Sequence, residues 1–310
     1  MRFSGHETFS IREGWLHKGL RLVYEDGAAF GDPYVADRLG VGKNMAKSIR
    51  HWLLATGLVE VAAGGRKSDR AAALQVTRLG DLILDRDPYF LEPMTWWVLH
   101  TNLVHNPERV TSWWWFFNVF RAPRFEKAGC VEALRLFIEA AQKRVPSPRT
   151  LDRDVSCLLR SYARELPPPT DYDPEEAYDC PFSEFGLLTH FRSSGSYRMN
   201  FGGKDIPGEA LGYCLARAFP RNEASSEAYA DVSLEEAVRM PGGPGAVFAL
   251  SEEPLFEWVQ GQEHANDLCL TSAAGERFIR YRRREPLAWL LSYYDRVAAR
   301  GRKGVACGVG

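Results

Sequence analysis

The stretch DPYVADRLGVGKNMAKSIRHWLLATGLVEV, residues 32–61, determines the expected fold of the N-terminal part of this 310-residue chain. Asp32-Pro33 is a typical helix start, because aspartate caps free N–H groups and proline fits the first helical turn. A short helix then reaches Leu39, and a tight turn over 40–42 precedes a second helix over 43–55. Apolar residues recur along that second helix at helical spacing and form one stripe: Met45, Ile49, Trp52 and Leu53.

A basic hairpin is expected after the second helix. Residues 58–61 alternate like a strand, residues 62–70 are rich in glycine, arginine and lysine, and residues 73–76 return. Two helices joined by a tight turn and followed by a basic hairpin are typical of a winged helix-turn-helix. We therefore predict that residues 1–90 form a DNA-binding domain of this type. The alternative is a winged helix that contacts only proteins.

The polar face of helix 43–55 carries the side chains expected to contact DNA. Cations bind phosphates, and amide and hydroxyl groups bind phosphates or base edges. These features favour double-stranded DNA as the partner. The predicted contact residues in this domain are Lys43, Asn44, Lys47, Ser48 and Arg50 on the helix, and Arg66, Lys67 and Arg70 on the wing.

The composition indicates a water-soluble globular protein, with 45% hydrophobic and 25% charged residues. No apolar run approaches the roughly 20 residues that cross a bilayer, and the N-terminus has no signal-peptide pattern. We therefore expect a cytoplasmic protein without membrane contact. The six cysteines are widely spread, which favours buried, reduced thiols over a disulfide framework.

The formal net charge is only −1, from 39 basic and 40 acidic residues, but the charges are segregated along the chain. Residues 38–78 carry eight Lys/Arg and two acids, residues 121–164 ten and five, and residues 277–303 nine and two. Acidic residues dominate 165–184 and 223–263. Clusters of basic residues are a common footprint of phosphate binding. Near-neutrality therefore does not exclude a protein with one DNA-facing side.

A second candidate reading helix begins at Ser147-Pro148. Arginines follow one face of this helix at helical spacing, and we predict three of them as DNA contacts: Arg149, Arg153 and Arg160. The helix opens a second winged-helix-like unit over 145–220, preceded by a helical linker region over 91–144.

The C-terminal part is expected to hold a helical or winged-helix-like unit over 221–295 and a flexible basic tail over 296–310. Residues 270–275 resemble 76–80, and 285–291 resemble 92–98, so a weak repeat predicts a helix capped by Thr271. The predicted fold class is mainly α (α+β), with tandem winged-helix-like units and small β-wings.

No common catalytic motif is present, so candidate chemistry rests on scattered residues. The segment His100 to His105 could form a metal or general-base site, although a helix end packed near the core is the simpler interpretation. His6 and Glu7 lie in a second polar segment, whose alternative is an N-terminal cap on the first domain. Carboxylates that could hold a metal include Asp152, Asp154 and the acids of 171–176. The aromatic run 113–117 favours core packing over base stacking.

Three stretches together resemble a known family. The opening FSGHETF (3–9), the segment LGVGKNM (39–45) with Trp52, and the later WWVLH (96–100) are similar to the domain-of-unknown-function 4007 family. SPRTLDRDV (147–155) is similar to the central motif of that family. The resemblance extends over nearly the whole chain.

The resemblance implies a function in single-stranded DNA phosphorothioation, an anti-phage modification that replaces a phosphate oxygen with sulfur. It implies a DNA-nicking endonuclease that works with a cysteine desulfurase, a sulfotransfer enzyme and an ATPase. Hydrolysis of a phosphodiester commonly uses Mg²⁺ or another divalent metal, which we expect as the cofactor. The resemblance places no catalytic residue on this sequence, so the predicted catalytic residues stay His6, Glu7, His100 and His105. The alternative function is a non-catalytic DNA-recognition adaptor or transcriptional repressor.

Overall fold

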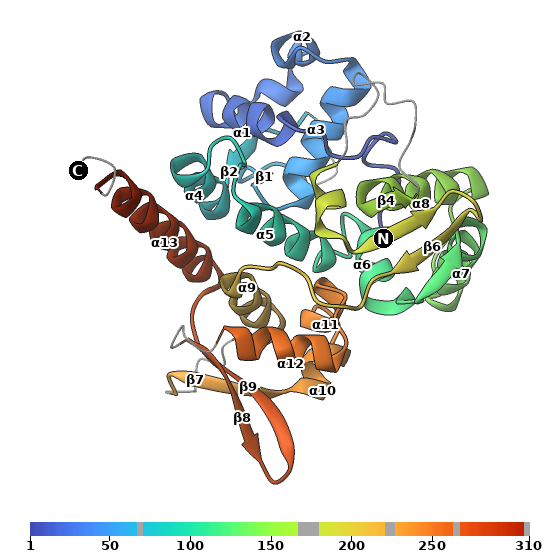
Figure 1. Cartoon of the computed structure of the whole chain (residues 1–310). Helices are drawn as coiled ribbons and strands as arrows, with labels where there is room; N and C mark the ends of the chain where they lie inside the picture. Colours follow the sequence, from blue (N-terminus) through green and yellow to red (C-terminus); the bar gives the residue numbers. More distant parts are fainter. Residues whose placement is uncertain (67–70, 167–179, 221–226, 263–266, 307–310) are drawn as a thin grey trace. The chain divides into compact units, whose positions relative to one another are not determined.

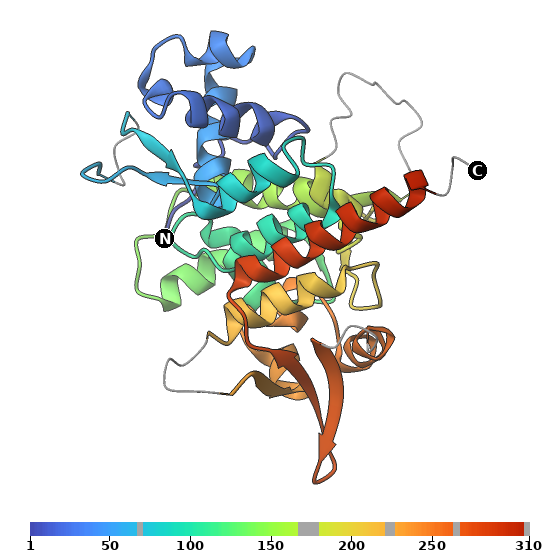
Figure 2. The same cartoon turned by 90° about the vertical axis from the view of Figure 1, so that its left-hand side faces the viewer.

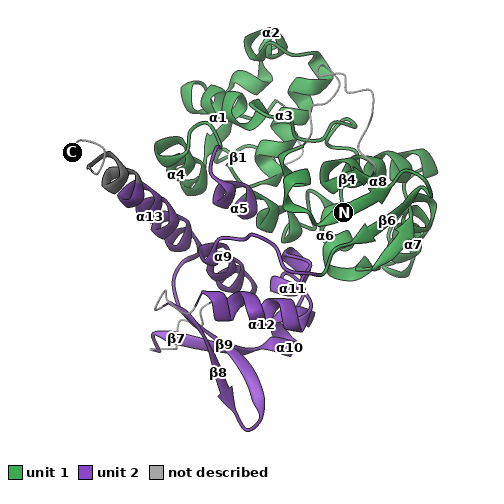
Figure 3. Ribbon diagram, viewed as in Figure 1, with its two compact units in different colours: residues 1–90, 99–201 green, residues 91–98, 202–310 purple. Residues whose placement is uncertain are grey.

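A computed structural model of the chain describes residues 1–66, 71–166, 180–220, 227–262 and 267–306, with no side chains described for 301–306 (Figure 1). Contacts divide the chain into two compact units (Figure 3). Unit 1 contains residues 1–90 and 99–201, and unit 2 contains 91–98 and 202–310. Helices with small sheets build both units, so the predicted α+β class is confirmed. The winged-helix assignment and the division along the chain stay predictions, apart from the C-terminal tail described below.

The N-terminal half of unit 1 has the predicted order of elements. A helix, a turn, a second helix and a hairpin follow one another, and the hairpin projects from the helices (Figure 2). The elements are α1 (Trp15–Glu25), η1 (Ala29–Gly31), α2 (Val35–Leu39), α3 (Lys43–Ala55), β1 (Val59–Val61), β2 (Leu74–Val76) and α4 (Arg78–Arg86).

Local sequence explains these boundaries. Gly40 ends α2 with φ 66°, a conformation that glycine adopts without strain, and its N–H donates back to the carbonyl of Asp37. Thr77 caps α4 by accepting from the N–H of Gly80. α1 packs against α3 at Gly19, where an added Cβ would lie 2.5 Å from Ile49. The two helices therefore need glycine at their contact.

The second half of unit 1 surrounds a four-stranded sheet of order β3-β6-β5-β4, in which only β4 and β5 are parallel. Its core is strongly aromatic: Trp113, Trp115, Phe116 and Phe117 are at most 2% exposed, which confirms the packing interpretation of this run. The elements are α6 (Thr111–Trp115), the π-helix η2 (Phe116–Phe120), β3 (Arg124–Glu126), α7 (Lys127–Ala140), α8 (Pro148–Tyr162), β4 (Ala163–Leu166), η3 (Pro181–Phe185), β5 (Leu188–Phe191) and β6 (Ser196–Met199).

Residues 121–140 belong with this sheet. β3 pairs with β6, and α7 packs on α8. Ser147 caps α8 as its sequence predicts, by accepting from the N–H of Thr150. Helix α5 (Pro93–Val104) contributes its residues 99–104 to unit 1 and 93–98 to unit 2.

Unit 2 packs its helices against a three-stranded antiparallel sheet of order β7-β9-β8, whose β8–β9 hairpin extends away from them (Figures 1 and 2). Besides the start of α5, its elements are α9 (Gly208–Ala218), β7 (Tyr229–Ser233), α10 (Leu234–Arg239), α11 (Pro244–Val247), α12 (Glu252–Gly261), β8 (Leu268–Ala273), β9 (Glu276–Arg282) and α13 (Pro286–Ala306). Across the described ranges, no helix combines the length and apolar character needed to span a bilayer.

Two predictions for unit 2 are wrong. Thr271 does not cap a helix, because it lies within β8. Ala274 and Gly275 have φ 52° and 85° and close a two-residue hairpin turn, which favours strand pairing. Of the flexible tail expected over 296–310, residues 296–306 are instead the second half of α13, and 307–310 lie outside the described residues. Arg296 fixes the helix there by donating two hydrogen bonds to Glu209, at 2.6 and 2.9 Å.

Candidate functional site

Helix α3 exposes side chains only along its first two turns. Lys43, Asn44 and Lys47 are exposed and Arg50 is half-buried, as their predicted role requires. Ser48 contradicts its predicted place on this polar face, because it is fully buried. More of the helix surface is buried than one apolar stripe implies, because α3 packs both on α1 and on the segment around Phe9.

The exposed face of α3 borders a hollow of about 340 Å³ within unit 1, here called the N-terminal pocket. α3 contributes one wall, and the others come from residues 2–7, from residues 30–36 around η1 and α2, and from Ala71. Its charged or titratable lining residues are Arg2, Glu7, Lys43, Lys47, Arg50 and His51. Four cations and one carboxylate therefore surround a single pocket.

The contacts of the α3 cations include neutral groups. Lys47 donates to the side-chain oxygen of Asn44 at 3.0 Å, and Arg50 donates to the carbonyl of Ala72 at 3.3 Å. The neutral amide of Asn44 does not cancel the charge of Lys47, so this side of the pocket favours anions.

A turn over residues 4–8 presents Glu7 to the pocket. Ser4, Glu7 and Thr8 have φ of 57°, 49° and 74°, the left-handed region that non-glycine residues seldom adopt. Strained backbone of this kind persists only where surrounding contacts hold it, and it is common at functional sites.

A buried network anchors this turn to the second half of unit 1. The Nε2 atom of His6 lies 2.9 Å from Oδ1 of Asp154, and the N–H of Ser4 donates to the same oxygen at 2.5 Å. Ser112 donates its hydroxyl to the other carboxylate oxygen at 2.6 Å. His6 is only 2% exposed and stacks on Trp52. The structure thus gives His6 an anchoring position behind the pocket rather than a place in it.

His51 forms part of the pocket wall and touches the turn. A Cβ added at Gly5 would lie 2.4 Å from its Nδ1, so the chain passes directly over the ring. Burial lowers the pKa of His51 well below its usual value, and positive charge from His6, Arg2 and Arg109 lowers it further. At neutral pH this part of the wall is therefore an uncharged imidazole.

The depressed pKa of His51 predicts a loss of stability in acid. An unfolded chain protonates this histidine near pH 6.5, and the folded protein does so only at lower pH, so acidification below 6.5 favours unfolding. One such group contributes a slope of at most about 1.4 kcal/mol per pH unit. We expect His51→Gln to reduce the slope of unfolding free energy against pH between about pH 6.5 and 5, measured by denaturant titration. A slope equal to that of the wild type would contradict this.

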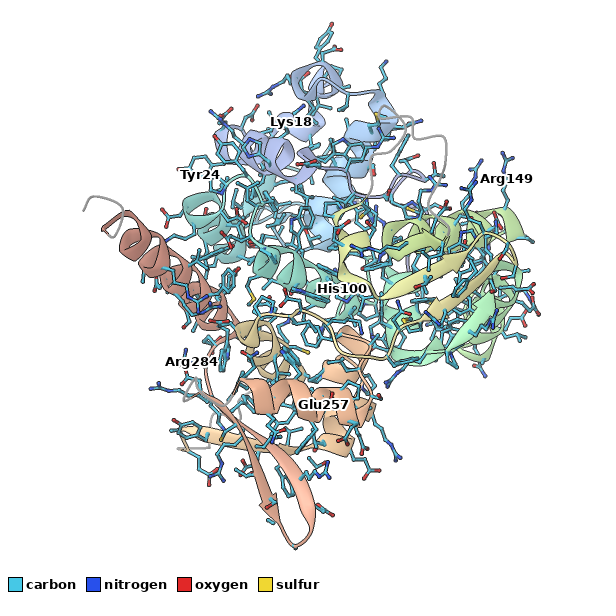
Figure 4. All side chains as sticks on the ribbon, viewed as in Figure 1. Lys18, Tyr24, His100, Arg149, Glu257 and Arg284 are labelled. Atoms are coloured by element: carbon cyan, nitrogen blue, oxygen red, sulfur yellow. The ribbon has the colours of Figure 1, made fainter. Side chains whose placement is uncertain are left out.

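The other predicted catalytic histidines lie outside the pocket. His100 on α5 is fully buried (Figure 4), its Nδ1 is 2.9 Å from the hydroxyl of Tyr162, and aromatic rings surround it. The Nδ1 of His105 lies 2.8 Å from the carbonyl of Thr101, one helical turn back. Both positions match the helix-end interpretation. Of the four predicted catalytic residues, only Glu7 lines the pocket.

The remaining predicted DNA contacts form separate surfaces. Arg149 (Figure 4), Arg153 and Arg160 are exposed on α8, and Arg66 is exposed after β1. None of them lines the N-terminal pocket. Lys67 and Arg70 lie outside the described residues.

The predicted carboxylate ligands for a metal do not gather in the described residues. Both carboxylate oxygens of Asp154 already have hydrogen-bond partners in the buried network, and Asp152 forms an ion pair with Lys127 at 2.9 Å. The acids of 171–176 lie outside the described residues. No group of three or more His, Cys, Asp or Glu that could hold a metal ion occurs in the part of the chain that the structure describes. These residues therefore do not fit a metal site built by protein ligands alone.

Sequence reasoning did not predict Arg2 or His51 at the pocket, nor the structural role of Asp154. Arg2 lines the pocket, and its backbone N–H donates to the hydroxyl of Thr111 at 2.8 Å. No pattern in the sequence indicates this position. The role of Asp154 was equally hidden, because its partners lie about 150 residues away in the chain. The only signal was that both ends of this contact fall in stretches that resemble one family.

Comparisons with known proteins agree on one relationship. Two solved structures of SspB, one of them with a bound magnesium ion, match with TM-scores of 0.79 and 0.80 at 26% sequence identity. Each match covers 94% of this chain and 88% of the SspB chain. A search of curated proteins finds no match. The family model described as protein of unknown function (DUF4007) matches residues 3–294, so the chain belongs to this family.

Proposed function

We propose that this chain binds DNA through the N-terminal pocket and the exposed face of α3, as a component of a DNA phosphorothioation system. One observation carries the proposal: Arg2, Lys43, Lys47 and Arg50 surround a single pocket that contains one carboxylate. A surface of this charge binds phosphodiesters, because each cation that neutralises a phosphate releases condensed counterions. The similarity to SspB and the family membership support the system to which we assign it.

Within that system, we propose that the chain nicks one DNA strand. Sulfur insertion requires access to a phosphate held in a duplex, and a nick releases that constraint. At the pocket, Glu7 accepts the proton of the attacking water, whose oxygen bonds to phosphorus as a P–O ester bond breaks. The surrounding cations stabilise the pentavalent phosphate, and the leaving oxygen takes a proton from solvent.

A divalent ion would add Lewis-acid activation of the phosphate. Magnesium keeps several water ligands and often binds through one or two carboxylates together with phosphate oxygens. Glu7 is the carboxylate of the pocket that could contribute to such a shared site. The proposed partners stay the cysteine desulfurase, the sulfotransfer enzyme and the ATPase of the system.

The second candidate function is a non-catalytic DNA-recognition adaptor or repressor. One observation favours it: His6 and His100 are at most 2% exposed and serve the core. An adaptor would use the same cationic face without hydrolysis.

Incubation with supercoiled plasmid separates the two functions. We expect the purified protein with Mg²⁺ to convert the plasmid to the open-circular form, and EDTA to prevent this. Glu7→Gln should lower the nicking rate by about 10²- to 10⁴-fold, the usual contribution of a general base. Glu13→Gln, which removes an exposed carboxylate nearby in sequence, is the matched control. DNA binding without any open-circular product at stoichiometric protein would leave only the adaptor function.

A further inference from the structure

The floor of the N-terminal pocket is apolar, which phosphate binding alone does not require. Four apolar residues of its lining are buried and are called the floor here: Phe30, Ala36, Ala46 and Leu54. Pro33 and Val35 add apolar surface that is more exposed. The cations of the lining, of which Lys43 and Lys47 are exposed, are called the rim. A phosphate offers no apolar surface to such side chains, and a deoxyribose offers only a small C–H face. The floor instead suits a flat, largely apolar group.

The size and charge of the pocket limit that group further. A volume of about 340 Å³ lies at the lower end of the range for small-molecule sites. The neutral ring of His51 adds an uncharged wall, and the cations gather at Arg2 and along α3. An apolar floor beneath a cationic rim matches the two parts of a nucleotide, with its base below and its phosphates above.

We propose that the N-terminal pocket holds a single unpaired base that has left the DNA stack, while the rim cations hold the phosphates on either side of it. This inference rests on the proposed function and names the state of the DNA that the site binds. A reading helix placed in the major groove contacts base edges without needing a hollow beside it. An extruded base needs such a hollow, and it brings its flanking phosphates to Glu7 and the cations.

The energetic signature is a preference for DNA in which the base is already extrahelical. Extruding a base from a duplex requires its unpairing and unstacking, which a bulged nucleotide has already undergone. We expect the wild-type protein to bind a duplex with a one-nucleotide bulge about tenfold more tightly than the fully paired duplex of the same sequence. Fluorescence anisotropy of labelled duplexes measures both affinities.

Two controls isolate the base from the flexibility of the bulge. A duplex with an abasic residue at the bulge bends similarly but offers no base, so it should bind like the paired duplex. Ala46→Leu and Ala36→Leu extend side chains that line the floor and should bring the affinity ratio between bulged and paired duplex to about one. Because the readout is a ratio, a general loss of binding does not imitate this result. Circular dichroism identifies whichever variant is folded, and either one suffices.

Each outcome decides the proposal. A wild-type ratio of about one, a preference kept with the abasic bulge, or a preference kept in a folded Leu variant would overturn the extruded-base site. In all three cases DNA binding by the cationic face would stand. If the protein binds neither duplex, the proposed function fails as well, so the two failures are distinguishable.

Discussion

Replacing Lys43, Lys47 and Arg50 together with alanine is expected to lower the affinity for duplex DNA by about a hundredfold at about 100 mM salt. It should also reduce the slope of log K against log salt by about 2.7, since each lost phosphate contact removes about 0.9. The three side chains lie on one face of α3 and border one pocket, so a single DNA segment can contact them all. Titrations at several salt concentrations measure both quantities.

A variant with the same change in net charge serves as the control. Lys18 (Figure 4) and Arg21 on α1 and Arg78 at the start of α4 are exposed in unit 1, and none lines the pocket. Replacing these three with alanine should leave the salt slope near the wild-type value, because non-contacting charges release few counterions. If both triple variants lose the same affinity and slope, binding follows net charge and α3 is not the reading element.

The local signals in the sequence predicted the helices near this site well. Each depends on neighbours in the chain: the Thr77 and Ser147 caps act within four residues, and the Gly40 turn within three. Helix α3 occurs with its predicted ends, Lys43 and Ala55. The same local reasoning failed at 270–275, because resemblance to 76–80 could not show that Ala274 and Gly275 would close a hairpin.

The pocket could be predicted only in part, because it depends on distant contacts. Periodicity identified Lys43, Lys47 and Arg50 as one face but could not show that residues 2–7 close the hollow. Periodicity also placed Ser48 on the surface, but this residue is fully buried. The sequence pattern does not show whether another segment covers a polar position on a helix. Burial of a helix on two sides is a tertiary property that one apolar stripe does not encode.

The contact between His6 and Asp154 joins residues that are 148 positions apart. Composition, spacing and local propensity carry no information about such a pair. The family resemblance did include both segments, 3–9 and 147–155, as separate stretches. Their meeting in one buried network gives the two stretches a shared role in packing.

Replacing Asp154 with alanine is expected to destabilise unit 1 by about 3–5 kcal/mol, the usual cost of removing one partner from a buried polar pair. Asp154 is 2% exposed and accepts hydrogen bonds from the N–H of Ser4 and the hydroxyl of Ser112, beside the ring of His6. Alanine leaves these buried groups without their acceptor, and each unsatisfied group costs about 1–3 kcal/mol. Urea denaturation followed by tryptophan fluorescence measures the loss, since Trp52 and Trp113 lie against His6.

Two further substitutions serve as comparisons for the loss of stability in Asp154→Ala. Ser112→Ala removes one donor but leaves the carboxylate its other partners, so we expect a loss of about 1 kcal/mol. Asp152 lies two residues before Asp154 on α8 and forms an exposed ion pair with Lys127 of α7. Asp152→Ala should therefore cost less than about 1 kcal/mol. The expected order of destabilisation is therefore Asp154→Ala, then Ser112→Ala, then Asp152→Ala.

If Asp154→Ala destabilised the protein no more than Asp152→Ala, the buried network would not be what holds the strained turn over residues 4–8. The position of Glu7 at the pocket would then need another explanation. If Asp154→Ala instead shows by far the largest loss of stability, a carboxylate outside the pocket stabilises the turn that carries Glu7.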